Sequence, residues 1–220
     1  TSTDRTITLP DATGSLLTSA DIVETNLTAD DNIGLGTNAV NSITTGDYNL
    51  GFGLNAGTAI TSGSNNIGIG ADALLVNNTG DNNTAVGTNS MRANTTGHKN
   101  VAVGNGALQA NTTAGNSTAV GNGALTTNTT GAGNTAIGYR ALVLNSTGAN
   151  NTAVGYDALD QNTTGTGNVA MGTLAADANT TGNYLVAIGR NALGANTTGH
   201  NNIAIGTEAL NANTTAGDNV

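Results

Sequence analysis

A glycine recurs every 17 residues along most of this chain. Eleven glycines keep that spacing without an insertion or deletion, and each closes a short apolar segment. They are Gly36, Gly53, Gly70, Gly87, Gly104, Gly121, Gly138, Gly155, Gly172, Gly189 and Gly206. A short, invariant period is typical of a solenoid, in which each repeat is one structural unit stacked on the next. No other feature of the sequence constrains the fold as strongly.

The segment before each glycine alternates in side-chain size. The residue one before the glycine is always apolar, and the residue two before it is always Gly or Ala. The residue four before it is Asn in nine of the eleven copies, with Ser117 and Leu185 as the exceptions. A period of two predicts a short strand with one bulky face and one small face. We expect the bulky side chains to form an aliphatic core: Val86, Val103, Val120, Ile137, Val154, Met171, Ile188 and Ile205.

The second half of each repeat predicts a corner followed by a turn. An Ala-Leu pair offers a second apolar anchor, and Asn-Thr-Thr-Gly is a sequence of turn-forming residues. Asn and Gly tolerate left-handed backbone angles, so we expect them to shape this turn. The predicted turn glycines include Gly97, Gly131, Gly148, Gly165, Gly182 and Gly199. A helix is disfavoured, because Gly alone costs about 1 kcal/mol at each helical position.

The predicted fold is therefore all-β, a parallel β-solenoid or β-roll built from 17-residue rungs. Residues 32–220 hold eleven repeats, and residues 1–31 are expected to form an N-terminal β-hairpin or entry segment. Parallel strand pairing advances about 4.8 Å per rung, so eleven rungs span roughly 50 Å. Asn219 and Val220 match the start of a twelfth repeat, and we expect the chain to belong to a longer fibre.

The column of Gly and Ala residues leaves two packing arrangements open. Either the rung is so flat that its two sides meet at this column, or a second chain packs against it. Aromatic residues make up only 2% of the chain, so a single coil would be thin. This favours a homotrimer, with a monomeric roll as the alternative.

Composition excludes several classes of protein. The net charge is −9 and there are only five Lys and Arg residues, so the basic stripe of a nucleic-acid-binding protein is missing. The chain has no Cys, which excludes disulfides and thiol-ligated metals. No apolar run is long enough for a membrane span, and we expect no membrane insertion by these residues.

Few residues are candidates for catalysis or metal binding. His98 and His200 occupy the same repeat position six rungs apart, so they are expected to be separate loop residues. Asp157 and Asp160 could form a carboxylate pair of the kind that glycoside hydrolases use. Asp occupies no repeated column, which argues against a calcium-dependent roll. We therefore predict no enzymatic activity, no metal and no cofactor.

Two further features of the turns invite a functional interpretation. Tyr139 and Tyr156 lie one repeat apart, where they could form an exposed stacking patch that contacts carbohydrate. Corner packing is the alternative. The turn also creates Asn-X-Ser/Thr tripeptides, the acceptor sequence for N-glycosylation, although the repeat alone explains them. Their asparagines include Asn94, Asn111, Asn128, Asn162, Asn179, Asn196 and Asn213.

The Ala-Val/Ile-Gly strand phrase resembles the head repeats of trimeric autotransporter adhesins, which are trimeric left-handed parallel β-rolls with shorter repeats. The full 17-residue phrase, preceded by "DRTITLPDATGSLLT", resembles the shafts of bacteriophage tail fibres. The resemblance implies a homotrimeric structural shaft, extracellular or on a virion surface. Such a shaft mediates attachment by holding a tip, outside these residues, that binds a host receptor or glycan. An ice-binding solenoid and a glycan-cleaving tail spike are the alternative functions.

Overall fold

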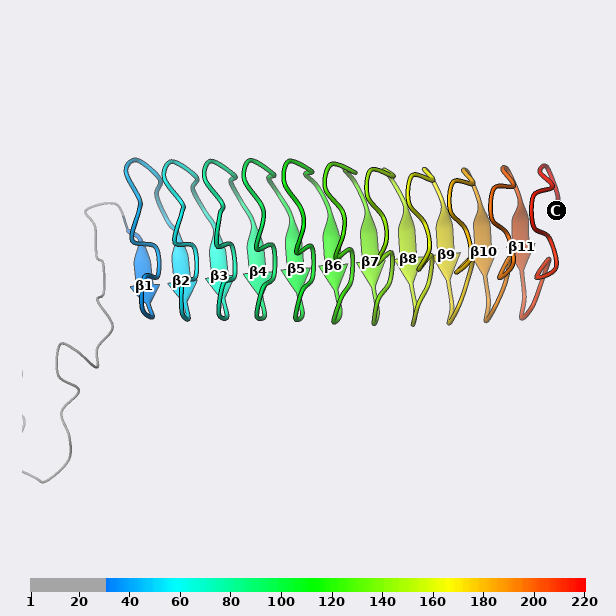
Figure 1. Ribbon diagram of the computed structural model, residues 1–220, viewed down its shortest axis with the longest axis horizontal. Helices are drawn as coiled ribbons and strands as arrows, with labels where there is room; N and C mark the ends of the chain where they lie inside the picture. The colour runs from blue at the N-terminus through cyan, green and yellow to red at the C-terminus, as the bar shows by residue number, and fades with distance from the viewer. Residues whose placement is uncertain (1–30) are drawn as a thin grey trace, which may run out of the picture.

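Residues 31–220 are described by a computed structural model, and they form one continuous parallel β-solenoid (Figure 1). The hairpin predicted in residues 1–31 lies almost wholly outside the described residues. Eleven three-residue strands follow at 17-residue steps, and residues 31–220 contain no helix. The strands are β1 (Ile33–Leu35), β2 (Leu50–Phe52), β3 (Ile67–Ile69), β4 (Thr84–Val86), β5 (Val101–Val103), β6 (Thr118–Val120), β7 (Thr135–Ile137), β8 (Thr152–Val154), β9 (Val169–Met171), β10 (Val186–Ile188) and β11 (Ile203–Ile205).

Each strand pairs in parallel with its neighbours in the chain. The sheet has 11 strands in the order β1 to β11, and Ala119 of β6 lies opposite Ala136 of β7, one repeat further on. Figure 1 shows the rungs side by side in chain order along the long axis, with every strand pointing the same way. The predicted fold class and the 17-residue rung are confirmed.

The interior of the coil is narrow and is filled by small residues and, in seven of the eleven rungs, by one Leu of the Ala-Leu pair. In the rung that contains β7, the buried apolar side chains are those of Ala136, Ala141 and Leu142. The same positions are buried in the rungs on either side and join into one apolar cluster. The Ala-Leu pair therefore supplies most of the core, as its predicted role of apolar anchor implies.

The strands alternate as predicted, but the bulky face points outward. The middle residue of every strand is buried, whereas the residues that flank it are exposed or half-buried. The prediction of a bulky aliphatic core is wrong for this coil, because its members lie on the outside: Val86, Val103, Val120, Ile137, Val154, Met171, Ile188 and Ile205.

The thinness of the rung explains this reversal. A Cβ atom placed on Gly51, in the middle of β2, would lie only 2.6 Å from the backbone oxygen of Ala56 across the rung. Gly alone fits at this point, and the Ala residues that occupy the same position in β4 to β11 are buried, so larger strand side chains must face outward. Of the two arrangements left open for the small-residue column, the flat rung is the one observed.

A sharp corner connects each strand to its Ala-Leu pair. In the β7 rung, Gly138 has φ 135°, and Arg140 and Leu142 both lie in the left-handed region with φ 52° and 54°. Leu rarely adopts this conformation. It persists here because the Leu142 side chain is fully buried and its backbone N–H donates to Ala158 O of the next rung at 3.0 Å.

The six predicted turn glycines lie in turns, but not for the predicted conformational reason. Their φ angles are not positive, and all six are buried. A Cβ atom on Gly131 would lie 2.2 Å from the backbone oxygen of Gly148 and 2.7 Å from Asn128 Oδ1. Glycine is favoured because neighbouring rungs approach closely, and the two residues that replace it in this column, Ala114 and Ala216, carry only a methyl group.

Two ladders of buried Asn side chains connect the rungs. In the first, four residues before each strand-closing glycine, Asn66 Nδ2 donates to Asn49 Oδ1 at 3.0 Å and to Gly80 O at 2.8 Å. In the second, at the start of each turn, Asn162 Nδ2 donates to Asn145 Oδ1 at 2.8 Å and to Gly165 O at 3.1 Å. These bonds pair the amides and carbonyls that the turns bury, which would otherwise be costly.

Candidate interaction face

The outward side chains of the eleven strands form one continuous stripe, which we call the strand face. It consists of the first and third residue of each strand. None of these 22 side chains is buried and none is charged; 18 are apolar and four are Thr. The four hydroxyl-bearing members are Thr84, Thr118, Thr135 and Thr152.

The in-register pairing of the strands aligns this stripe along the coil. Ile137, for example, lies between Val120 and Val154 of the neighbouring strands, and it is 41% exposed. Strand spacing and side-chain alternation make the stripe roughly 50 Å long and roughly 12 Å wide, or about 600 Å². That area is of the same order as the ~800 Å² that each partner contributes to a standard protein interface. Contiguous apolar surface of this size is typical of an interaction site.

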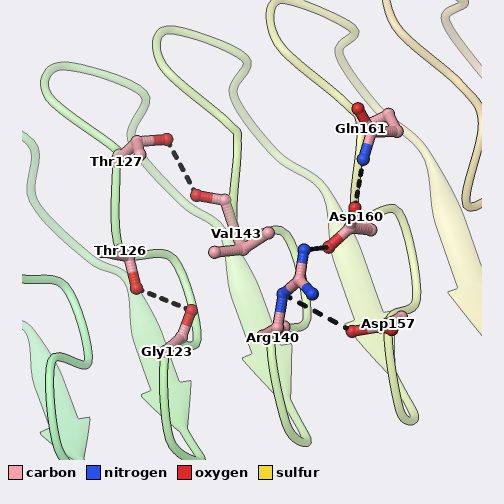
Figure 2. Close-up of polar contacts among 8 residues, drawn as sticks. All are labelled: Gly123, Thr126, Thr127, Arg140, Val143, Asp157, Asp160 and Gln161. Carbon is pink, nitrogen blue, oxygen red and sulfur yellow. Dashed lines mark hydrogen bonds and ion pairs between the residues drawn. The ribbon is translucent and has the colours of Figure 1, made fainter.

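The predicted carboxylate pair lies on a corner of the coil and is held by an arginine. Figure 2 shows Arg140 extending to the next rung, where its Nη2 contacts Asp160 Oδ1 at 2.9 Å and its Nε lies 3.8 Å from Asp157 Oδ1. Gln161 Nε2 donates to the other oxygen of Asp160. Both carboxylates therefore belong to an ion-pair network that links two rungs.

Asp177 lies one rung beyond Asp160, at the equivalent position. Burial raises the pKa of its carboxyl, and the negative charges of Asp160 and Asp157 raise it further. Asp177 Oδ1 and Asp157 Oδ1 are buried atoms without a hydrogen-bond partner. Among residues 31–220, these two oxygens are the only buried side-chain polar atoms that lack a hydrogen-bond partner.

The two tyrosines stack as the sequence suggested. The rings of Tyr139 and Tyr156 lie 5.4 Å apart with an interplanar angle of 15°, and both are about half-exposed. The Asp157 charge, ahead of burial and a hydrogen bond to the same carboxylate, raises the pKa of the Tyr156 phenol. Each ring thus places one face on the other ring and keeps about half of its surface open to solvent.

The two histidines are separate and exposed, as predicted. His200 Nδ1 accepts a hydrogen bond from the backbone N–H of Asn183 at 3.0 Å, while His98 lies six rungs away in the same column. Among residues 31–220, no group of three or more His, Cys, Asp or Glu side chains is arranged to hold a metal ion.

The glycosylation tripeptides of the turn place their Asn inside the coil. Their asparagines form the second ladder, and those from Asn77 to Asn196 have no exposed surface. A buried amide that donates two hydrogen bonds cannot accept a sugar while the coil is folded. The structural interpretation therefore accounts for these tripeptides. Asn82, Asn116 and Asn150 also begin such tripeptides and are exposed.

No protein family, curated protein or solved structure matches this chain. The part of the chain that the structure describes contains no helix that could cross a membrane. The strand face includes the residues just before the strand-closing glycines, which the sequence interpretation assigned to the interior, and it runs along all eleven strands of the described residues. The sequence did contain an indication that this face lies outside. The residue just before the glycine varies in size from Val to Phe, whereas the residue two before it is always Gly or Ala.

Proposed function

We propose that this chain forms the shaft of a homotrimeric fibre, in which three coils pack through their strand faces. The observation that carries the proposal is the uncharged, largely apolar strand face that runs the full length of the coil. Exposed parallel strands rich in Val and Ile are otherwise a liability, because parallel sheets normally have both faces covered. A copy of the same chain offers an equally long and equally spaced stripe to cover it.

The narrowness of the stripe favours three chains over two. A stripe two side chains wide suits the axis of a bundle, where each chain directs only one edge toward the others. A two-layer sandwich would instead require a broad sheet on each chain. The charged corner around Arg140 then lies toward solvent, where ion pairs are tolerated, and the stacked tyrosines border the strand face.

Shaft function rests on the regularity of the coil together with the resemblance to adhesin heads and tail-fibre shafts. A stack of identical rungs is stiff and extends by about 4.8 Å for each added repeat, so its length is set by repeat number. The proposed place is a virion or an external cell surface, and the proposed partner is a host receptor or glycan bound by a tip beyond these residues.

Electron microscopy of the purified chain tests the assembly. We expect a short rod that is three coils wide, and we expect a Val103→Asp variant to give single coils, because it buries three charges at the axis. A wild-type preparation that contains only single coils would contradict the proposal.

One observation favours an ice-binding solenoid as a second function. The residue just before the turn Gly or Ala is an exposed Thr or Ser in every turn, which gives one aligned hydroxyl in each of the eleven rungs: Thr45, Ser62, Thr79, Thr96, Thr113, Thr130, Thr147, Thr164, Thr181, Thr198 and Thr215. Its neighbour is engaged, since Thr129 Oγ1 donates to Ser146 O at 3.0 Å, so only a single row is presented. Thermal hysteresis measurements discriminate the two functions, and a shaft is expected to produce none.

A further inference from the structure

The rung that contains β2 differs from all other rungs on the outside. The chain places a bulky apolar side chain at four alternate positions from residue 48 to residue 54: Tyr48, Leu50, Phe52 and Leu54. Leu50 and Phe52 belong to the strand face, and Tyr48 and Leu54 border it. Tyr48, Phe52 and Leu54 are 61%, 54% and 52% exposed. No other described rung is apolar at all four positions.

An interface between identical repeats does not by itself fix the register of the chains, and the β2 rung can fix it. Sliding one chain past another by one rung, about 4.8 Å, replaces each strand-face residue with its counterpart from the next repeat. Val86, Val103 and Val120 are identical, and Thr135 repeats Thr118, so across β4 to β8 such a slip only exchanges Val with Ile or Val with Thr. Uniform strands specify their register weakly, and a single unusual residue often fixes the register of a repetitive assembly.

Building on the proposed trimer, we infer that the β2 rung sets the register of the three chains. Phe52 is the only Phe in the chain and the only aromatic residue in the strand face. Within one chain it lies between Leu35 and Ile69, so a slip of one rung sets its ring against an aliphatic side chain of a different shape. In register, the Phe52 rings of all copies meet in one layer, which preserves ring-to-ring contacts and close packing.

Cysteine cross-linking of the full chain tests this inference, because the chain has no Cys of its own. Two variants, Val103→Cys and Ile137→Cys, place a thiol on the strand face two rungs apart. That axial offset is about 10 Å, beyond the ~7 Å between Cα atoms that a disulfide tolerates. Chains of the two variants carry tags of different size, are unfolded together, refolded together and oxidised.

In the wild-type background we expect each variant to cross-link with itself and no links between the two. Adding Phe52→Val to both chains is expected to permit slips of one and two rungs, which bring position 103 of one chain to within one rung of position 137 of another or level with it, and so to produce links between the two positions. Ile69→Val is the matched control, since it trims the same column one rung away without removing an aromatic ring. It should leave the pattern unchanged.

The outcomes separate the two proposals. Self-links with no mixed links in the Phe52→Val background, or mixed links already in the wild type, would overturn the role of the β2 rung and leave the trimer intact. Absence of any link, with a monomeric protein, would overturn the trimer itself. Circular dichroism of each variant confirms that the coil has folded, which the exposure of Phe52 leads us to expect.

Discussion

The two sides of each strand differ in residue size and in burial, and this difference shows which residues hold the coil together. The inner side is Ala or Gly in all eleven rungs, whereas the outer side varies among Leu, Phe, Ile, Val, Met and Thr. Ala136 is fully buried, while its neighbour Ile137 is 41% exposed. The inner side is limited by the width of the rung, and the outer side is free of that limit. The strands therefore contribute only their smallest residues to the interior, beside the Ala-Leu pair, and their larger residues remain available for contacts between chains.

The largest expected effect comes from introducing a charge on the inner side of β7, compared with the same change on its outer side. Ala136→Asp places an unpaired carboxylate in the interior, and we expect it to lower the free energy of unfolding by about 3–5 kcal/mol. Urea unfolding followed by circular dichroism measures the loss. Ile137→Asp is the matched variant on the outer side; it should leave the coil folded and abolish association. Equal destabilisation by the two variants would contradict the assignment of inside and outside.

The buried Asn ladder should show the next largest effect. Asn162→Ala removes two donated hydrogen bonds and leaves the Asn179 amide without its acceptor at 2.8 Å. Unpaired buried polar groups cost about 1–3 kcal/mol each, and we expect a total loss of about 3 kcal/mol in unfolding free energy. The exposed Asn122 offers the control, since Asn122→Ala should change stability by less than about 0.5 kcal/mol.

Substitutions of glycine should be costly in the buried turns and nearly neutral at the exposed corners. Gly131→Ala must displace the backbone of the neighbouring rung, and we expect a cost of about 1–3 kcal/mol. Gly123 has φ 71° on an open corner, where the nearest atoms to an added Cβ lie 3.5 Å away. Asn occupies the equivalent position with positive φ in other rungs, including Asn55 and Asn89. Gly123→Asn should therefore be nearly neutral in thermal unfolding, and a large loss of Tm would be unexpected.

The smallest effect is expected at the acidic corner. The pKa of Asp177 is raised in the folded coil above its ordinary value of 3.8, so the native state disfavours the charged form. Below pH 3.8 both states bind the proton and the effect vanishes; as pH rises through the folded pKa, the native state is progressively destabilised. Asp177→Asn should therefore raise Tm slightly at neutral pH and leave it unchanged in acid. A fall in Tm at neutral pH would contradict the cause assigned to this shift.

The repeat was sufficient to predict the parallel solenoid, its 17-residue rung and the role of the Ala-Leu pair. It did not predict which face of the strand lies inside. Alternation in size identifies residues that share a face, but the usual rule that larger apolar residues are buried fails when a rung is too thin to contain them. The left-handed backbone conformation of Leu142 could not be predicted either, because it depends on burial of the side chain and on a hydrogen bond to the next rung. The β2 rung was visible in the sequence, but only the exposure of Phe52 shows that its ring is available to another chain.

Sedimentation equilibrium of the wild-type chain at micromolar concentration tests the central claim most directly. If the strand faces pack around a common axis, the protein should sediment at three times its chain mass of 21.5 kDa, and the Ile137→Asp variant at one chain mass. A wild-type protein that sediments at a single chain mass would show that the strand face does not join copies of this chain.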